Sequence, residues 1–154
     1  MTAERTSFVY VTYIASTPQK VFEAITRPDI AWRYWGHENV SDWTPGAQWQ
    51  HIRANDERTV ELVGEVVEIA PPAHLVITWA NASQADDPDA HSRVTFTIEE
   101  YEDMVRLTVS HDELIAGSGM EAGVSKGWPV VLSSLKSFLE TGRGLDIFAR
   151  PKAA

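Results

Sequence analysis

Hydrophobic residues change their spacing along the chain and divide it into three parts. Residues 8–14 read FVYVTYI, a β-branched and aromatic run that predicts a strand covered on much of both faces. Ser16, Thr17 and Pro18 are typical of a helix start, and the apolar positions that follow predict a short helix to about Thr26. A second short helical turn is expected over residues 30–34, closed by Gly36.

The middle of the chain, from about Trp43 to His111, alternates apolar and polar residues with turn sequences between the runs. The runs predict five strands, at residues 47–53, 59–69, 75–80, 94–99 and 105–110. Short turns such as Thr44-Pro45-Gly46 connect them, and the acidic segment 81–89 is expected to be a solvated loop. Such short connections predict antiparallel hairpins rather than βαβ units.

The last third has a helical period and predicts one long amphipathic helix from about Ser118 to Thr141. Its apolar stripe consists of Val124, Trp128, Val131, Leu132, Leu135, Phe138 and Leu139. Pro129 is expected to bend this helix, and Gly142 to end it. The element order predicts an α+β fold with two short helices after the first strand. In it, a curved antiparallel sheet of about six to seven strands wraps around the C-terminal helix.

Length, charge and composition narrow the functional classes. The 154 residues predict a single domain over 1–154, with a core of about 7–142 and a frayed tail at 143–154. The absence of cysteine excludes disulfide scaffolds, cysteine-based zinc sites and a cysteine nucleophile. A net charge of −9 disfavours nucleic acids and acidic membranes as partners. The polar N-terminus and the lack of a long apolar stretch predict a cytoplasmic protein without a membrane partner.

Several short motifs occur in a fixed order along the chain. They are Ala15-Ser16-Thr17-Pro18, Trp43-Thr44-Pro45-Gly46, Gly64-Glu65-Val66, Thr78-Trp79, Gly127-Trp128-Pro129 and residues 135–142. In this order they resemble the START/Bet v 1-like (SRPBCC) superfamily, and within it the branch related to the C-terminal domain of activators of the Hsp90 ATPase. The resemblance implies a helix-grip fold with an apolar cavity between sheet and helix. It transfers no catalytic residue, and the further N-terminal domain of eukaryotic Hsp90 activators has no counterpart in this sequence.

The other motifs and residues that could bind a cofactor or a metal, or act in catalysis, are better explained by structural roles. The segment GSGMEA at 117–122 fits a dinucleotide fingerprint, but no parallel strand follows its helix, so we predict no cofactor. The five histidines lack metal-ligand spacing, and we predict no metal site. The glutamates at 61, 65, 68, 99 and 100 are expected on solvated faces. His111 continues the alternation of inward-facing residues on its strand. We expect it to bond to a backbone carbonyl rather than to contact a ligand.

Several tryptophans share the face that should enclose the interior. We predict a cavity that holds an apolar or aromatic small molecule with one polar anchor. Its predicted walls are Trp49, Trp79, Phe96, His111, Trp128, Leu132 and Leu135. We predict no catalytic residue. Two alternatives stay open: a module that contacts a chaperone such as Hsp90, and a cyclase- or hydrolase-like enzyme using the same cavity. The sequence also leaves the oligomeric state open, a homodimer included.

Overall fold

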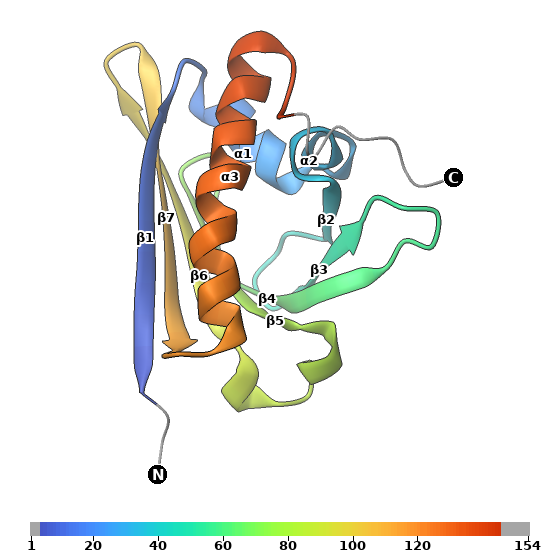
Figure 1. The fold of residues 1–154 in the computed structure, drawn as a ribbon. Helices are drawn as coiled ribbons and strands as arrows, with labels where there is room; N and C mark the ends of the chain where they lie inside the picture. The colour runs from blue at the N-terminus through green and yellow to red at the C-terminus, as the bar shows by residue number, and fades with distance from the viewer. Residues whose placement is uncertain (1–3, 146–154) are drawn as a thin grey trace.

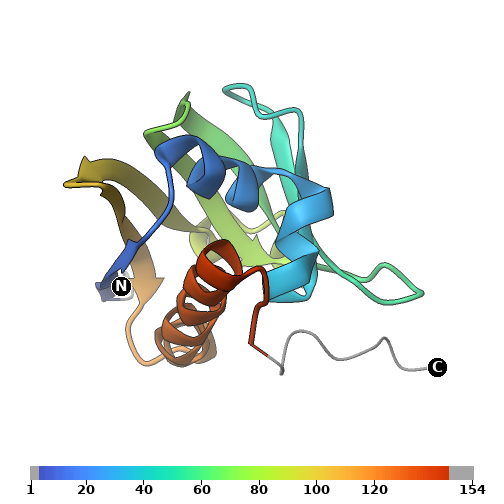
Figure 2. The ribbon, with the colours of Figure 1, turned by 90° about the horizontal axis from the view of Figure 1, so that it is seen from above.

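The computed structural model describes residues 4–145, where seven antiparallel strands form one curved sheet that holds a long helix in its concave face (Figures 1 and 2). The strand order is β1-β7-β6-β5-β4-β3-β2, so both ends of the sheet are edge strands. The strands are β1 (Arg5–Ile14), β2 (His37–Ser41), β3 (Gln48–Arg53), β4 (Val60–Ala70), β5 (His74–Asn81), β6 (Ser92–Tyr101) and β7 (Met104–Ile115). The predicted α+β helix-grip architecture is confirmed.

Capping residues mark the starts of the first and third α-helices and the ends of the second and third. In α1 (Pro18–Thr26), the Thr17 side chain accepts a hydrogen bond from the backbone of Lys20. The second helix, α2 (Pro28–Trp35), is longer than the predicted turn because Pro28 occupies its first turn, where proline is tolerated. Gly36 ends it with a φ of 73°, in the left-handed region. The long α3 (Gly119–Thr141) begins directly after its N-cap Ser118, close to the predicted start, and passes through Pro129 without interruption.

Two local predictions need correction. Strand β2 has no counterpart among the predicted strands, because its sequence HENVS contains a single apolar residue. It forms by pairing with β3, which places His37, Asn39 and Ser41 opposite Arg53, His51 and Trp49. Strand β1 is covered on one face only. Val9 and Val11 are 56% and 45% exposed, because α3 lies on the concave side of the sheet and the described chain places nothing over the convex side.

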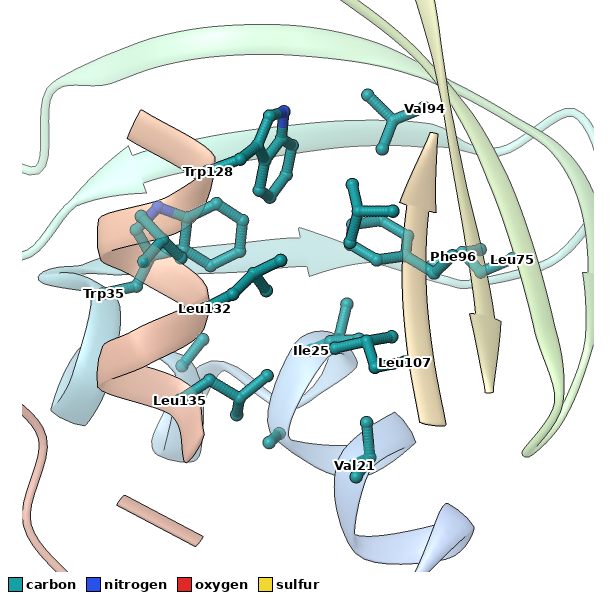
Figure 3. Packing of buried hydrophobic residues seen from close by; sticks show 14 of the residues in the cluster. Val21, Ile25, Trp35, Leu75, Val94, Phe96, Leu107, Trp128, Leu132 and Leu135 are labelled. Atoms are coloured by element: carbon teal, nitrogen blue, oxygen red, sulfur yellow. The ribbon is translucent and has the colours of Figure 1, made fainter. Parts of the chain in front are cut away.

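The core fills the space between the sheet and α3 along most of the helix (Figure 3). Leu132 and Leu135 point from the helix toward Phe96 and Leu107 of the sheet, and α1 closes one end. Strands β4 and β5 approach closely at Gly64, where an added Cβ would lie 1.9 Å from the carbonyl oxygen of Thr78. Only glycine fits there without separating the two strands.

The described end of the chain is attached to the fold. The predicted frayed tail spans 143–154, of which residues 146–154 lie outside the described residues. The backbone N–H of Leu145 donates to Ser134, and the hydroxyl of Ser137 donates to the carbonyl of Arg143. Residues 143–145 are therefore held against α3. Across residues 4–145, no helix has the length and apolar character needed to cross a membrane.

Candidate functional site

A partly open cavity of about 580 Å³ lies between α3 and the β2–β5 half of the sheet. It is bounded by the end of α2, by β2 to β5, by the short 3₁₀ helix η1 (Ala82–Gln84) and by the N-terminal half of α3. Its lining residues are Trp35, His37, His51, Val60, Glu61, Leu62, Trp79, Asn81, Ala82, Ser83, Gly123, Val124, Gly127, Trp128 and Val131. The volume falls within the range of about 300–1,000 Å³ that is typical of small-molecule sites.

Three indole rings form the inner wall of this cavity. The Trp128 ring lies 5.6 Å from that of Trp35 and 5.4 Å from that of Trp79, centroid to centroid. Figure 3 shows Trp35 and Trp128 together beside α3. All three residues are less than a tenth exposed. Aromatic faces at these separations form a surface on which a flat apolar molecule can pack.

The helical wall of the cavity is formed partly by glycine. Gly123 and Gly127 lie one turn apart in α3, and a Cβ added at either one would meet no atom within 4 Å. Glycine inside a helix costs about 1 kcal/mol relative to alanine. Because nothing in the packing requires these glycines, what they provide is open space beside the indoles.

A buried histidine lies at the polar end of the cavity, with its protonation fixed by its neighbours. Asn39 donates its amide NH₂ to the carbonyl of Ile25, so its Oδ1 faces Nδ1 of His51 at 2.7 Å. Since Oδ1 can only accept, Nδ1 of His51 carries the proton and Nε2 presents a lone pair. Burial, and next the nearby charge of His37, lower the pKa of His51 well below its ordinary value. His51 is therefore neutral near pH 7.

A charged cluster adjoins His51. The His37 ring stacks on the His51 ring, with centroids 4.3 Å apart and planes 5° from parallel. Nδ1 of His37 faces the carbonyl of Trp35, and its Nε2 faces the Glu61 carboxylate. Both partners are acceptors, so each ring nitrogen of His37 faces an acceptor. Burial would raise the pKa of Glu61, but hydrogen bonds from His37 and Arg53 outweigh it and hold that pKa below its usual range.

His111 differs from the prediction made for it, because its partners are side chains rather than a backbone carbonyl. The indole N–H of Trp128 donates to Nδ1 of His111 over 3.0 Å, so the proton of the neutral ring is on Nε2. That nitrogen donates to the hydroxyl of Ser92 at 2.7 Å, and Ser92 in turn donates to the carbonyl of Trp79. Burial lowers the pKa of His111 to about 4. Both ring nitrogens are thus occupied within the protein.

The seven predicted wall residues are all buried, and they separate into two groups. Trp79 and Trp128 line the cavity. The others lie in the packed interior behind it: Trp49, Phe96, His111, Leu132 and Leu135. The Trp49 ring stacks on that of Trp79 at 5.1 Å, and His111 holds the Trp128 indole, so both support the wall from behind. The open volume lies nearer the β2–β4 edge than the sequence indicated.

The polar residues of the cavity were not predicted. Glu61 was expected on a solvated face but contacts His37 and Arg53 at the cavity, with 29% of its side chain exposed. A signal for His51 was present in the sequence, because it follows Trp49 by two positions on the same strand. Residues two apart share a face, so the inward orientation predicted for Trp49 applied equally to His51.

Neither the described histidines nor the acidic residues form a metal-binding group. Across residues 4–145, no three His, Asp or Glu side chains are gathered in a way that could hold a metal ion. The glycine-containing segment 117–122 forms a turn and the first residues of α3, where Ser118 accepts from the backbone N–H of Glu121. This segment caps a helix that follows an antiparallel strand, an arrangement without the βαβ unit that a dinucleotide requires.

One family profile and many solved structures are similar to the chain. The profile described as "Activator of Hsp90 ATPase homolog 1-like protein" matches residues 15–140. The Aha1 dimer from Colwellia psychrerythraea is 21% identical, with a TM-score of 0.74, over 90% of this chain and 99% of that one. Protein MLL2253 from Mesorhizobium loti is 25% identical, with a TM-score of 0.72, over 88% and 97% of the two chains.

A third similar structure is CalU16 from Micromonospora echinospora. It is 20% identical, with a TM-score of 0.67, and the match covers 92% of this chain and 88% of that one. No curated protein sequence matches the chain significantly. At these identities, the structural matches establish the fold.

Proposed function

We propose that this chain, which belongs to the family of Activator of Hsp90 ATPase homolog 1-like proteins, binds an apolar or aromatic small molecule. The binding site is the cavity between the sheet and the last helix. The observation that carries the proposal is the combination of an indole wall with open volume. A protein interior is normally packed to crystal-like density. About 580 Å³ of partly open space beside three tryptophans therefore supports a binding role for this side of the molecule.

The two glycines of α3 support the same proposal. Gly123 and Gly127 both line the cavity, and each forgoes the helix stabilisation that alanine would give. A side chain at either position would project into space that a ligand would use. The fold gains nothing from that space, whereas a bound aromatic molecule gains contact with Trp35 and Trp128.

The experiment fills the cavity without disturbing the fold. Gly127→Leu places a side chain in the open volume, where the added Cβ has no neighbour within 4 Å. Gly119→Leu is the matched control, since Gly119 is on the same helix with equally free space but outside this cavity. A panel of naphthalene derivatives is titrated while indole fluorescence and melting temperature are recorded.

We expect saturable binding by the wild type and by Gly119→Leu, and loss of binding in Gly127→Leu with the fold retained. Ligand at a hundredfold excess over Kd should stabilise the wild type by about 2.7 kcal/mol. If neither signal changes for any compound, the binding proposal is wrong. Native mass spectrometry of freshly purified protein would then identify any natural ligand by its mass.

A second candidate function is contact with a chaperone such as Hsp90. The family description favours it, and so does an exposed apolar strip on the convex face, made of Val9, Val11, Tyr13 and Tyr101. The rings of Tyr13 and Tyr101 meet edge to face at 5.1 Å. Exposed apolar groups of this kind are typical of interaction sites.

The test of this candidate is the ATPase rate of purified Hsp90 with and without the protein. We expect stimulation by the wild type and its loss in Val11→Asp, which changes the strip and leaves the cavity intact. No stimulation by the wild type would exclude this function. The relative from Colwellia psychrerythraea was solved as a dimer, so sedimentation of both proteins will reveal whether the strip joins two copies instead.

A further inference from the structure

The cavity-lining residues include two ring nitrogens that no described residue uses, Nε2 of His51 and Nε1 of Trp79, and the first can accept a hydrogen bond. Nε2 of His51 has no hydrogen bond to any residue between 4 and 145, whereas Nδ1 of the same ring is bonded to Asn39. The His51 side chain is only 3% exposed, and it lines the cavity. Among the described residues, the only buried side-chain nitrogen or oxygen without a partner is Nε1 of Trp79. Nε2 of His51 is therefore still reached by solvent through the cavity, and a ligand group that donates to it would replace that water.

The chemistry of this atom follows from the fixed tautomer. The chain from the Ile25 carbonyl through Asn39 to Nδ1 leaves Nε2 as a lone pair that can accept but not donate. A partner must therefore bring its own proton, as an O–H or N–H group. An ether, an ester carbonyl or a carboxylate offers only acceptors and would face the lone pair unfavourably.

The neighbouring charges decide whether that partner is neutral. The His37 ring lies face to face with His51 at 4.3 Å, and its Nε2 faces the Glu61 carboxylate. Glu61 is already engaged by His37 and Arg53, which leaves it little capacity to balance another cation. An ammonium group at Nε2 would therefore lie at the buried end of the cavity without a free carboxylate to balance its charge.

We infer that the ligand of this cavity is a neutral aromatic molecule carrying a hydroxyl group, whose O–H donates to Nε2 of His51 while its rings pack on the indole wall. This inference rests on the proposed function and names the chemical class of its ligand. Asn39 is a positioning residue, which holds His51 in the accepting tautomer. His51, which is not among the seven wall residues predicted from the sequence, is the polar anchor.

The experiment compares four probes that share one ring system. The probes are 2-naphthol, which donates and accepts; 2-methoxynaphthalene, which only accepts; 2-methylnaphthalene, which does neither; and 2-naphthoate, an anion. Kd values are measured at pH 7.5 for the wild type, for His51→Phe and for His74→Phe. His74 pairs with Glu68 outside the cavity, so its variant controls for loss of a histidine from the same sheet.

We expect 2-naphthol to bind the wild type and His74→Phe about tenfold or more tightly than the methyl and methoxy compounds, which is the usual value of one buried hydrogen bond. In His51→Phe the difference should fall to within about twofold, since phenylalanine keeps the stacked ring and lacks the acceptor. Naphthoate should bind weakest.

The outcomes separate this inference from the proposed function. Equal affinity of the wild type for 2-naphthol and 2-methylnaphthalene would overturn the anchor and leave cavity binding intact. Absence of binding for all four probes would overturn both. If His51→Phe fails to fold, ¹⁵N spectra of histidine in the wild type replace it. The Nε2 resonance of His51 should move on addition of 2-naphthol and not of 2-methoxynaphthalene, and the reverse result would contradict the inference.

Discussion

Two buried histidines on opposite sides of the indole wall show how differently the two halves of the molecule use similar groups. His111 on β7 and His51 on β3 are both nearly inaccessible, and burial lowers the pKa of each. His111 has both nitrogens bonded, one to Trp128 and one to Ser92. His51 has a described partner on one nitrogen only, and it faces a cavity.

This difference in hydrogen bonding distinguishes a structural histidine from one available to a ligand, which burial or the pKa alone does not. A polar side chain whose hydrogen bonds are all made within the protein fixes the packing around it. A polar side chain held rigidly on one side and left open on the other is prepared for a partner. On this criterion the β6–β7 side of the sheet is structural, and the β2–β5 side carries the proposed site.

The largest expected effect comes from removing the ring that joins the two halves. Trp79 stacks on Trp49 and contacts both Trp128 and His111. We expect Trp79→Ala to lower the free energy of unfolding by about 3–5 kcal/mol, the usual range for a buried aromatic residue. Chemical denaturation measures it. A loss below about 1 kcal/mol would show that the wall contributes little to packing.

Trp79→Phe is the control for this variant. The indole N–H of Trp79 is buried and has no hydrogen-bond partner among residues 4–145. Phenylalanine keeps an aromatic ring and removes that unpaired donor, so we expect a loss of less than half that of Trp79→Ala. A loss as large as that of alanine would mean that the indole makes a bond essential to the fold.

A second expected effect is acid sensitivity. In the unfolded protein, His111 has an ordinary pKa near 6.5, whereas in the folded protein its pKa is about 4. The unfolded state binds more protons between these values, so the stability contributed by neutral His111 is present above pH 6.5 and is lost as the pH falls. At about 1.4 kcal/mol per pH unit, we expect a loss of about 2 kcal/mol between pH 7 and pH 5.

His51 acts in the same direction, since its pKa is also lowered. Urea denaturation of the wild type and of His111→Phe at pH 7 and pH 5 measures how much of the acid-induced loss of stability is due to His111. The variant should be less stable at pH 7, because Trp128 and Ser92 lose their partner, and should lose less on acidification. An unchanged pH dependence in the variant would contradict the role given to His111.

Substitutions at two glycines are expected to have effects of opposite sign, the smaller of them at Gly127. Gly64→Ala forces a Cβ against the Thr78 carbonyl, and we expect it to destabilise the protein by about 1–3 kcal/mol. Gly127→Ala adds a Cβ to open space, and we expect it to stabilise the protein by about 0.5–1 kcal/mol. Thermal denaturation compares the two. Destabilisation by Gly127→Ala would mean that the cavity wall is packed after all.

The fold could be predicted from the sequence because its signals are local. The alternation in β6 and β7, the helical stripe of α3 and the caps at Thr17 and Ser118 each depend on neighbouring residues only. Strand β2 could not be predicted in this way. Its inward positions are His37 and Asn39, which are favourable there only because β3 and β4 bring His51 and Glu61 to meet them.

The site was predicted in part for the same reason. The alternation of the strand and the apolar stripe of the helix indicated that Trp79 and Trp128 face the interior, where they line the cavity. These patterns do not distinguish a residue that lines a cavity from a fully packed one such as Phe96. Glu61 was placed on a solvated face because charged residues usually are. Its pairing with His37 and Arg53 joins separate strands and has no local signature.

The most direct test of ligand binding in the cavity is a crystal structure of the protein grown with saturating 2-naphthol. We predict that the naphthalene ring lies against Trp35, Trp79 and Trp128, with its oxygen about 2.6–3.0 Å from Nε2 of His51. A cavity occupied by solvent alone, or a ligand bound only on the convex face, would contradict it.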